Sequence, residues 1–420
     1  MQAFSYLKNR GLIYQSSQLI EDALKAITSS QSLYIGVDPT AKGLHIGHLM
    51  ACRALKRFHD AGAKTIALVG GATALIGDPS FKAKERDILS AEDVFNNAEE
   101  IKKDIQRVLE SDGDENLQFV NNYDWYSKMN TIAFLRDVGK NMRVQSMLAK
   151  DSVNKRIHSE NSMSFAEFAY QCLQANDYLY LHKNYGCICQ IGGSDQWGNI
   201  TSGIDLIKKT TNHAVHGMTV PLLTNSKGQK FGKSEGNAIW INKSRTSNND
   251  FYQFFLRVED ADLPTLFRML TDLPQETIQE VLQEHQKSPD KRAAQSLLAD
   301  TVMMSVRSKE DLEKAKRCAE LLYGGAESVT SEMIAGLVDE LPLVRIAKGE
   351  AKATLADVMV KLGLADSKKA AKRLISGGGV YMNEKSVKQP AYAIQATDLV
   401  DGSVLPVRVG KRTRKFALFE

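Results

Sequence analysis

Cysteine is scarce in this 420-residue chain, and the five that occur form no Cys-x-x-Cys pair: Cys52, Cys172, Cys187, Cys189 and Cys318. An odd number of cysteines in so long a chain argues against a disulfide framework and favours reduced, buried thiols. Cys187 and Cys189 alternate within an apolar run, which is more typical of a strand core than of a metal site. We therefore expect no structural zinc.

Long hydrophobic runs are also missing. No apolar run approaches the length that spans a bilayer, and the first 15 residues lack the long apolar region and small-residue cleavage site of a signal peptide. The composition is 43% hydrophobic and 25% charged, with 9 prolines and no low-complexity segment. These features predict a soluble, globular, multidomain protein without a membrane partner, for which the simplest location is the cytoplasm.

The net charge of +4 hides an asymmetry along the chain. Residues 341–420 hold fifteen Lys or Arg against seven Asp or Glu, an excess of eight, so the remainder of the chain carries −4. A basic tail on a mildly acidic body indicates a polyanionic partner, because phosphate contacts are electrostatic. A solvated charged surface would have the same composition.

The first half of the chain has the pattern of a parallel α/β sheet. Residues 32–37 and 65–69 are short apolar runs, and residues 49–59 between them have apolar side chains at helical spacing. A strand, helix and strand of these lengths predict a parallel βαβ unit.

Further strand signals occur at residues 187–191 and 218–223, and helices are expected between the two sets at residues 91–112 and 131–147. We therefore predict a doubly wound, Rossmann-like nucleotide-binding sheet with inserted helices. Such sheets bind ligands beyond the carboxyl ends of their strands.

Beyond residue 243 the pattern becomes helical and then changes again. Residues 251–256, 263–270, 277–285 and 293–321 are amphipathic, and a compact region of alternating character begins at residue 351. The predicted segments are a catalytic domain at 1–224, a mobile loop and linker at 225–246, a helical domain at 247–326, a connector at 327–350 and a small α+β domain at 351–420.

Two short motifs carry most of the chemical information. In His45-Ile46-Gly47-His48, two histidines three residues apart stand where the chain enters a helix, so both rings can face one anionic ligand. In Lys230-Phe231-Gly232-Lys233-Ser234, two lysines flank a glycine in a loop after a late strand, where they can stabilise a pyrophosphate leaving group. Alone, the first could be a helix cap and the second a solvated loop; together they indicate an ATP site that forms an adenylate.

The two motifs resemble the signatures of class I aminoacyl-tRNA synthetases, and other segments narrow the resemblance to the bacterial-type tyrosyl-tRNA synthetases. These segments occur in order over nearly the whole chain: Arg10-Gly11-Leu12-Ile13-Tyr14-Gln15, Asp38-Pro39-Thr40, Gly77-Asp78-Pro79-Ser80 and the run from Gln190 to Ile200. The family often has a cysteine at the position of Ile35, so a thiol contact to the ribose would be lost here.

The residues of one helical stretch agree with this resemblance. Tyr170, Gln174 and Asp177 lie at i, i+4 and i+7, so three polar side chains share a stripe that has apolar neighbours. The resemblance implies that Tyr170, Gln174 and Asp78 bind the ammonium of tyrosine. It places Tyr34 and Asp177 at the phenol, with Gln190 beside the substrate. A phenol both donates and accepts a hydrogen bond, whereas a phenyl ring would leave these groups unpaired.

The resemblance also assigns the ATP contacts. Gly36, Asp38, Gly47, Gly193, Asp195 and Gln196 would contact the adenylate, and Thr40, His45 and His48 the phosphates, while Lys82, Arg86, Lys230 and Lys233 would close over the pyrophosphate. The tyrosine carboxylate would attack the α-phosphate without a general base, and Mg²⁺ would be bound through ATP phosphates rather than by a protein cage. The family also implies a homodimer, with an interface around Phe165.

The basic tail resembles an S4 RNA-binding fold. Residues 365–375 form a basic amphipathic stretch, and residues 377–385 read as a turn into a short strand pair. The expected phosphate contacts, with tRNA(Tyr) as the partner, are Lys368, Lys369, Lys372, Arg373, Lys411, Arg412, Arg414 and Lys415.

Three other interpretations stay open at this point. A synthetase for another aromatic amino acid would have to satisfy Asp177 and Tyr34, which an indole does better than a phenyl ring. A small nucleotidyltransferase shares His-x-Gly-His but needs neither the helical domain nor the basic tail. An RNA-binding protein that has lost catalysis would not need the whole set of His45, His48, Lys230, Lys233, Asp78 and Asp177.

Overall fold

The computed structural model describes ten stretches of the chain, and the described residues form two compact units. The stretches are 2–80, 89–158, 163–234, 237–323, 329–334, 336–337, 340–341, 343–347, 354–410 and 413–420, without the side chains of 233, 234, 237, 331 and 413. The first unit comprises Met1–Arg245 and Glu259–Pro289, and the second Thr246–Val258 and Asp290–Glu420.

The predicted βαβ unit is confirmed. Strand β2 (Ser32–Val37) and strand β3 (Lys64–Val69) are parallel and in continuous register from Ser32 opposite Lys64 to Val37 opposite Val69. Helix α3 (Leu49–Asp60) connects them and buries Leu49, Cys52, Leu55 and Phe58 against the sheet, the face that its apolar spacing predicts.

The sheet of the first unit has the strand order β1-β6-β5-β2-β3-β4 in the described residues. The further strands are β1 (Gln15–Ser16), β4 (Leu117–Asn121), β5 (Cys187–Gly193) and β6 (His216–Val220). All neighbours are parallel except β1, which is antiparallel to β6. From β2 the order proceeds to β3 and β4 on one side and to β5 and β6 on the other. The carboxyl ends of β2 and β5 therefore flank the topological switch point, where doubly wound sheets bind ligands.

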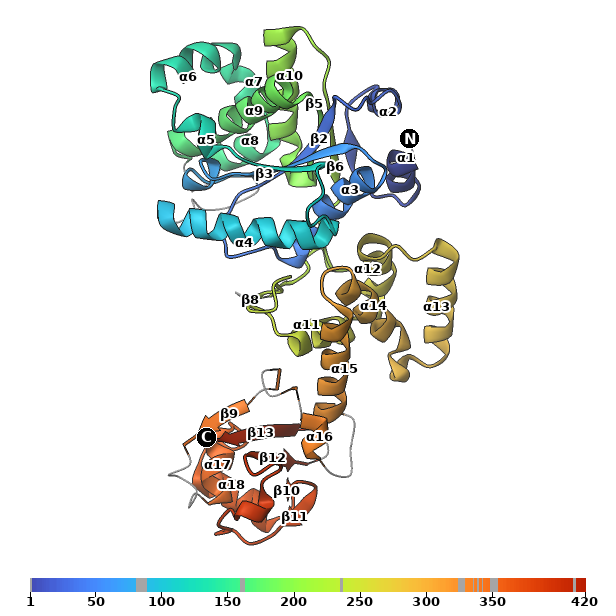
Figure 1. The fold of residues 1–420 in the computed structure, drawn as a ribbon, viewed down its shortest axis with the longest axis vertical. Helices are drawn as coiled ribbons and strands as arrows, with labels where there is room; N and C mark the ends of the chain where they lie inside the picture. The colour runs from blue at the N-terminus through green and yellow to red at the C-terminus, as the bar shows by residue number, and fades with distance from the viewer. Residues whose placement is uncertain are drawn as a thin grey trace. The chain divides into compact units, whose positions relative to one another are not determined.

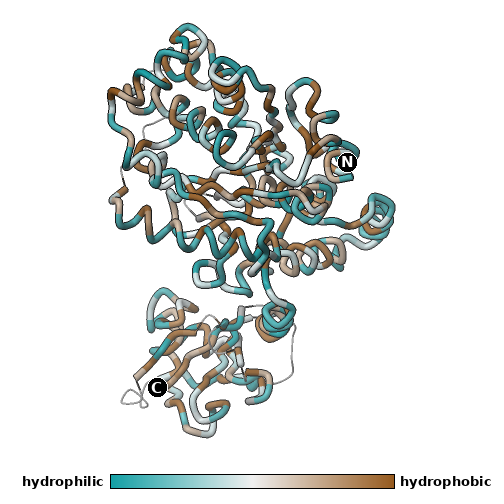
Figure 2. Tube along the Cα trace, turned by 45° about the horizontal axis from the view of Figure 1, so that its top comes forward, coloured by the Kyte–Doolittle hydropathy of each residue, from teal (hydrophilic) through white to brown (hydrophobic). Residues whose placement is uncertain are grey.

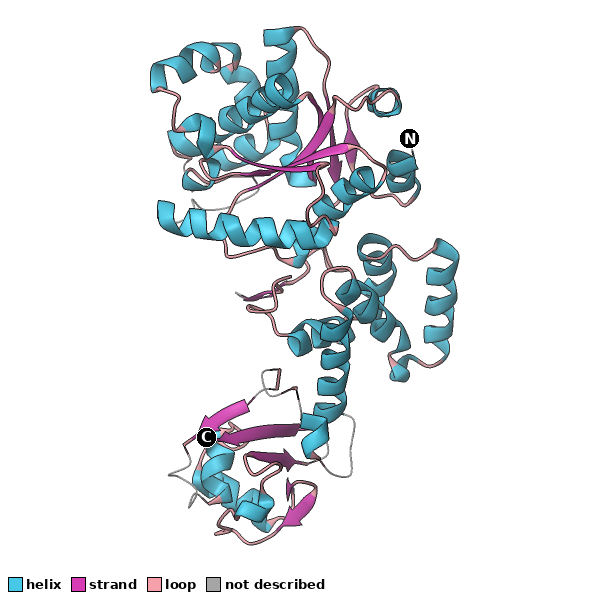
Figure 3. Ribbon diagram, in the orientation of Figure 1, coloured by secondary structure: helices cyan, strands magenta, loops and turns pink. Residues whose placement is uncertain are grey.

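Helices cover both faces of this sheet (Figures 1 and 3). Helices α3 and α4 (Ala91–Leu109) pack on one face, and α9 (Phe165–Tyr185) and α10 (Trp197–Thr211) pack on each other and on the opposite face. The strands between them are largely hydrophobic (Figure 2), and their core includes Tyr34, Ile66, Leu68 and Tyr178. A sheet covered on both sides explains why its strands read as continuous apolar runs.

The segment between the two halves of the sheet differs from the prediction in two places. Strand β4 lies within it and was not predicted. The single helix expected at residues 131–147 is wrong, because the segment forms α6 (Thr131–Asp137), a 3-10 turn and α7 (Val144–Leu148). Met142 and Arg143 are extended at the interruption, in a stretch whose Gly139 and Asn141 are poor helix formers.

Shorter elements complete the first unit. They are α1 (Gln2–Asn9), α2 (Ile20–Lys25), α5 (Tyr123–Tyr126), α8 (Asp151–Ile157), β7 (Lys233–Ser234), β8 (Asn237–Ala238), α12 (Leu263–Leu270) and α13 (Gln275–Lys287). No helix in the described residues is both long and apolar enough to cross a membrane.

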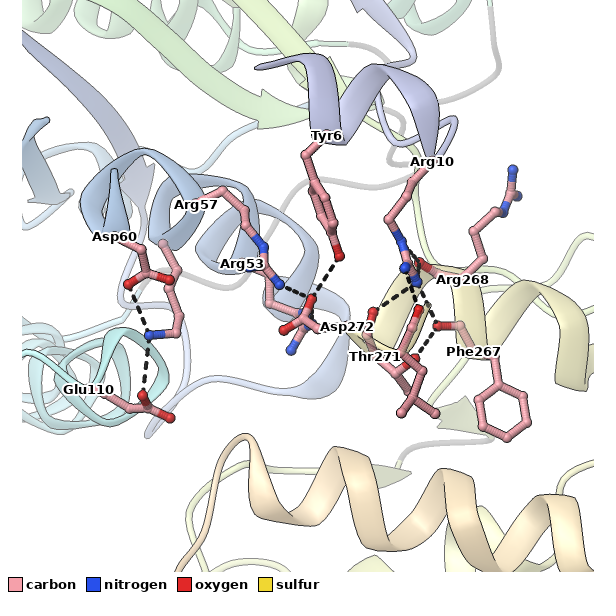
Figure 4. A network of polar contacts seen from close by, with 12 residues as sticks. Tyr6, Arg10, Arg53, Arg57, Asp60, Glu110, Phe267, Arg268, Thr271 and Asp272 are labelled. Atoms are coloured by element: carbon pink, nitrogen blue, oxygen red, sulfur yellow. Dashed lines mark hydrogen bonds and ion pairs between the residues drawn. The ribbon is translucent and has the colours of Figure 1, made fainter. Parts of the chain in front are cut away.

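Helix α12 is joined to α1 and α3 by a polar network (Figure 4). Arg10 donates to the carbonyl oxygens of Arg268, Thr271 and Leu273 at the end of α12, the Leu273 contact being 2.7 Å. Asp272 accepts from Tyr6 at 3.1 Å and pairs with Arg53 at 2.6 Å and with Arg57. Burial would raise the pKa of Asp272, but Arg53 and Arg57 outweigh it and the pKa is lowered. These contacts place α12 and α13 in the same unit as the sheet.

The second unit contains the other predicted helices and one short helix, α16, within the segment expected to be a connector. They are α11 (Asn248–Leu256), α14 (Ala293–Met304), α15 (Lys309–Tyr323) and α16 (Ser331–Ile334). The long helix expected at residues 293–321 is therefore two helices, α14 and α15. The segment predicted as one helical domain is thus distributed over both units. Buried Arg307 fixes the junction between α14 and α15, because it donates to Asn248 at 2.5 Å and to the carbonyl of Thr246 at 2.6 Å.

The C-terminal part is a five-stranded sheet with two helices, as expected for a small α+β domain. Its elements are β9 (Leu343–Ile346), α17 (Leu355–Lys361), α18 (Lys368–Ser376), β10 (Val380–Met382), β11 (Lys385–Val387), β12 (Val404–Val409) and β13 (Thr413–Phe419), with the strand order β11-β10-β12-β13-β9. β9 pairs in parallel with β13. The segment expected to be a connector, residues 327–350, therefore contributes an edge strand to this sheet.

Candidate active site

A cavity of about 250 Å³ opens at the carboxyl ends of β2 and β5, where the sheet topology predicts a ligand site. Most of the residues predicted from the sequence line it: Tyr34, Gly36, Asp38, Thr40, His45, Gly47, His48, Asp78, Tyr170, Gln174, Asp177, Gln190, Gly193, Asp195, Gln196 and Lys230. The fold therefore brings together segments from five separate parts of the chain. Ile35 is buried on β2 and is not among the described residues that line the cavity.

The inner end of the cavity contains two groups suited to a phenol. Asp177 is 2% exposed on α9 and accepts from Asn122 Nδ2 and from Trp125 Nε1, each at 3.0 Å. Tyr34 lies on β2, and its buried hydroxyl has no hydrogen-bond partner within the described part of the protein; the same holds for Gln190 Oε1. A buried polar atom without a partner is costly, so this end of the cavity fits a ligand that offers both a donor and an acceptor.

The protonation of Asp177 follows from its surroundings. Burial raises the pKa of Asp177 to about 7, against the lowering effect of the hydrogen bonds from Asn122 and Trp125. The effect of burial on the pKa is therefore larger than that of the two hydrogen bonds.

A chain of hydrogen bonds connects Asp177 with the middle of the cavity. Asn122 Nδ2 donates to Thr73 Oγ1 at 2.9 Å, and Thr73 Oγ1 donates to Asp38 Oδ1 at 2.7 Å. Tyr170 on α9 donates to Asp38 Oδ2, also at 2.7 Å. Burial raises the pKa of Tyr170 well above its usual value, and the charges of Asp38 and Asp78 raise it further. Negative charge therefore gathers in this region, which favours a cationic group of a ligand.

Asp78 is held by Gln196, which follows β5, and by the backbone of Ser80 in its own segment. Gln196 Nε2 donates to Asp78 Oδ2 at 2.7 Å, and the backbone N–H of Ser80 donates to Asp78 Oδ1 at 3.0 Å. Asn199 donates to Ser80 Oγ at 3.3 Å and to Gln196 Oε1 at 3.2 Å. Each carboxylate oxygen of Asp78 is thus held by a different segment, and Asp78 remains on the cavity wall.

The histidine motif forms a compact cap on the 3-10 turn Ile46–His48 that leads into α3. His45 Nδ1 accepts from the N–H of Gly47 at 3.1 Å, and His48 Nδ1 accepts from the N–H of His45 at 3.2 Å. The two rings stack with centroids 3.8 Å apart and an interplanar angle of 21°. An Nδ1 that accepts carries no hydrogen, so each ring carries its hydrogen on Nε2 and can donate from that atom. The capping interpretation and the ligand-binding interpretation are therefore compatible.

The lysine motif lies directly against the histidine motif. Gly232 has φ +76°, and a Cβ added there would lie 2.4 Å from Ile46 Cδ1. Lys230 lines the cavity, and the N–H of the next residue, Phe231, donates to the carbonyl of Leu223 at 2.9 Å. Only glycine combines this backbone conformation with so close an approach to Ile46.

Helix α4 anchors the loop that precedes His45. Asn97 Nδ2 donates to the carbonyl of Pro39 at 3.1 Å, and the fully buried Asp104 accepts from the N–H of Leu44 at 2.8 Å. Gly43 has φ +118°, and a Cβ there would lie 2.7 Å from Asp104 Oδ2. The loop from Pro39 to Leu44 is therefore fixed at both ends, and Thr40 lies within it.

Several predicted site residues fall outside the described part of the chain or differ from expectation. Lys82, Arg86, Lys411, Arg412 and the side chain of Lys233 lie outside it. Lys368, Lys369, Lys372 and Arg373 line one basic hollow on α18. Lys415 donates to the carbonyl of Leu362 at 2.7 Å.

Arg414 does not have the exposed position expected for a phosphate contact. It is 5% exposed, donates to the carbonyl of Leu321 and to Glu384 Oε1, and so occupies an internal position. The positive charge of Arg414 is neutralised within the second unit, because Glu384 in the β10–β11 turn pairs with it at 2.8 Å.

Sequence reasoning missed the residues that support the cavity from behind. These are Thr73, Asn122, Trp125, Asn97 and Asp104. The signal for Asn122 was present, because a polar residue directly after an apolar strand marks the ligand side of a parallel sheet. Asn97 and Asp104 interrupt the apolar face of α4, which could have identified them as buried polar partners.

The raised pKa of Asp177 predicts a pH-dependent stability difference for Asp177→Asn. The folded protein retains this proton up to about pH 7, whereas an unfolded chain releases it near pH 4. Wild-type stability therefore falls as the pH rises through this window, and the variant lacks this loss. As the pH rises through this window, the free energy of unfolding of the variant should increase relative to that of wild type by a few kcal/mol. The scale is on the order of 1.4 kcal/mol per pKa unit. Urea titrations at pH 4.5 and 8 measure it; a difference that stays constant with pH would contradict the burial argument.

Comparison with protein families gives two matches that together cover most of the chain. The family of tRNA synthetases class I (W and Y) matches residues 26–324. The C-terminal domain of the Tyrosine--tRNA ligase SYY-like proteins matches residues 332–418. The first family covers enzymes for both tryptophan and tyrosine, and the second is specific to tyrosine.

Individual relatives agree with the family matches. The chain is 41% identical to Tyrosine--tRNA ligase of Roseiflexus castenholzii, over 97% of this chain and 96% of that protein. It is 42% identical to Tyrosine--tRNA ligase 1 of Bacillus licheniformis, with the same coverage. Among solved structures, a C-terminally truncated mitochondrial tyrosyl-tRNA synthetase of Aspergillus nidulans has a TM-score of 0.66 and 30% identity, covering 76% of this chain and 94% of that one. The chain therefore belongs to the tyrosine–tRNA ligases of the class I aminoacyl-tRNA synthetase family.

Proposed function

We propose that the cavity at the carboxyl ends of β2 and β5 binds L-tyrosine and ATP and joins them as tyrosyl-adenylate, with release of pyrophosphate. The tyrosyl group is then transferred to the 3′-terminal ribose of tRNA(Tyr). The observation that carries this proposal is the buried hydroxyl of Tyr34, which has no partner within the described residues and lines the same cavity as Asp177.

The phenol of the substrate fits these two groups. Its hydroxyl can donate to the Asp177 carboxylate and accept from the Tyr34 hydroxyl, while Gln190 lines the same cavity. A phenylalanine ring would leave the buried Tyr34 hydroxyl unpaired and would offer no donor to Asp177, so recognition by the cavity alone discriminates against it. An indole offers one donor and no acceptor, which leaves Tyr34 unsatisfied.

The ammonium and carboxylate of the substrate then point toward the mouth of the cavity. The ammonium is surrounded by Tyr170, Gln174 and Asp78. The negative charges of Asp38 and Asp78 attract it to this region. Alternation along β2 places Tyr34 and Gly36 on one face, about 6–7 Å apart. Gly36 has no side chain to block the path from the phenol to the phosphate.

ATP occupies the outer part of the cavity. Gly47, Gly193, Asp195 and Gln196 contact the adenylate, and an ionised carboxylate such as Asp195 can accept from ribose hydroxyls. Thr40, together with the Nε2 atoms of His45 and His48, donates to the phosphates, and Lys230 supplies a cation there. Lys82, Arg86 and Lys233 are the further cations for the pyrophosphate.

The reaction needs positioning and charge stabilisation rather than a base. The tyrosine carboxylate is already ionised at neutral pH and attacks the α-phosphate, and the developing charge is stabilised by donors that are fixed before the reaction. Mg²⁺ enters with ATP, whose phosphate oxygens are the hard ligands it prefers. The described residues contain no group of three or more His, Cys, Asp or Glu suited to hold a metal, so the ion is expected on the nucleotide.

Tyr34→Phe tests the recognition of the phenol. We expect kcat/KM for tyrosine in pyrophosphate exchange to fall about 10- to 100-fold, the effect of losing one buried hydrogen bond, with little change for phenylalanine. Tyr178→Phe is the matched control, because the Tyr178 hydroxyl donates to the carbonyl of His216 at 2.7 Å and its ring lies next to Tyr34. No exchange with tyrosine in the wild type, or equal exchange with phenylalanine, would refute the proposed substrate.

The C-terminal sheet and its helices are proposed to bind tRNA in an S4-like manner. Helix α18 exposes Lys369, Lys372 and Arg373 on one side, and its other side buries Ala371 and Ile375. A row of cations on a helix contacts an RNA backbone through phosphates.

Lys372→Ala tests this surface. We expect weaker tRNA binding, a salt dependence of log affinity reduced by about 1, and unchanged pyrophosphate exchange. Lys64→Ala, an exposed lysine of the first unit, is the control. Filter-binding measurements at several salt concentrations give the slope of log affinity against log salt concentration. Equal slopes in wild type and variant would show that Lys372 does not contact an RNA phosphate.

A homodimer is proposed through the segment that contains α6 to α9. Large apolar side chains are exposed there, including Ile132 at 72%, Val144 at 60% and Phe165 at 77%. Exposed apolar side chains in such numbers are typical of an interaction surface. A second copy of this chain is the occupant that the family implies.

Phe165→Asp is expected to convert the dimer into monomers, because it places a charge within this apolar surface. Analytical ultracentrifugation measures the mass. Tyr14→Asp serves as the control, since Tyr14 is 63% exposed elsewhere in the same unit. A dimer that persists in the Phe165 variant would place the interface on another surface.

A further inference from the structure

Trp240 lies on a short extended segment that joins the two signature motifs. After β8, residues 239–241 run antiparallel to residues 44–46, with His45 and Trp240 as a bridge pair. The N–H of Ile46 donates to the carbonyl of Ile239 at 3.0 Å, and the N–H of Ile241 donates to the carbonyl of Leu44 at 2.8 Å. The histidine motif is therefore hydrogen-bonded on both sides of His45.

The same segment reaches back to the lysine motif. The N–H of Ile239 donates to the carbonyl of Gly232 at 3.1 Å, while its carbonyl accepts from Ile46. One residue thus bonds to a member of each motif. The position of residues 239–241 therefore depends on the lysine loop and, in turn, constrains the histidines.

The side chain of Trp240 extends this connection to the His45 ring. The indole meets His45 edge to face, with ring centroids 6.0 Å apart and an interplanar angle of 65°. The Arg245 guanidinium lies 4.3 Å from the indole centroid, and Arg245 also donates to the carbonyl of Lys42. His45 is stacked on His48 as well, so the imidazole is packed between two rings. Aromatic pairs of this geometry contribute about 0.5–1.5 kcal/mol beyond burial.

We propose that Trp240 is a positioning residue for the activation step: it holds the His45–His48 pair in the orientation that donates to the ATP phosphates. Trp240 is not among the described residues that line the cavity, so it acts through His45 rather than on the substrate. The second torsion of a histidine side chain is broad, and packing therefore has to fix the ring. This inference rests on the proposed role of His45 in adenylate formation.

Trp240→Leu and Trp240→Phe test the proposal. The leucine variant keeps the backbone bonds of residues 239–241 but removes the aromatic edge against His45. We expect its kcat for tyrosine-dependent pyrophosphate exchange to fall about 10- to 100-fold, as small misplacements of catalytic groups do. We expect the dissociation constant for tyrosine, measured by equilibrium dialysis, to stay within about twofold because the phenol end is untouched. The phenylalanine variant restores an aromatic edge and should recover most of the lost kcat.

Tyr6→Leu is the matched control. Tyr6 also lies under a guanidinium, with Arg57 4.5 Å from its ring centroid, but it packs at the other end of α3 (Figure 4). Its kcat should stay close to wild type. An unchanged kcat in Trp240→Leu, no recovery in Trp240→Phe, or an equal loss of tyrosine affinity would overturn the positioning role. A wild-type protein without tyrosine-dependent exchange would instead refute the proposed function itself, so the two failures are distinguishable.

Discussion

The buried carboxylate of Asp177 is the constraint on which the rest of the site depends. A carboxyl group that is nearly inaccessible to water needs hydrogen bonds on both oxygens, and Asn122 and Trp125 supply those bonds. Asn122 also reaches Thr73, which bonds Asp38, which accepts from Tyr170 on the same helix as Asp177. The requirement to satisfy one carboxylate therefore fixes α9 against the ends of β2, β3 and β4.

The outer part of the site is built on a different principle. There the histidine and lysine motifs are positioned mainly by backbone hydrogen bonds and by close contact at glycine, with α4 holding the preceding loop through Asn97 and Asp104. A rigid inner end suits recognition of one amino acid. Backbone-tethered donors at the mouth suit a step in which phosphate charge shifts from bond to bond.

The sequence predicted the parts of the fold that have a strong local pattern. β2, α3, β3, α12 and α18 follow apolar periodicity closely because each buries one face in its own unit. β4 was missed because its alternation is weak at the edge of the sheet, where Gln118 is exposed. The interruption between α6 and α7 follows the weak helix preference of Gly139 and Asn141. The junction between α14 and α15 instead lies where buried Arg307 bonds Asn248 and Thr246, which are distant in sequence. The cavity residues were predicted through motif resemblance, whereas their supporting partners depend on contacts between distant segments, which no local pattern encodes. Arg414 shows the same limit, since its sequence neighbours suggested a phosphate contact while Glu384 and Leu321 hold it inside.

The contact between Gly232 and Ile46 has a consequence for how this chain can vary. The glycine has a left-handed backbone conformation, and the isoleucine fills the space that any side chain at position 232 would need. Shortening the isoleucine would relieve the steric clash. It would not relieve the backbone strain, which depends only on the residue at position 232. A shorter residue at position 46 would therefore give a side chain at position 232 the space it needs, but the left-handed backbone would still favour glycine there.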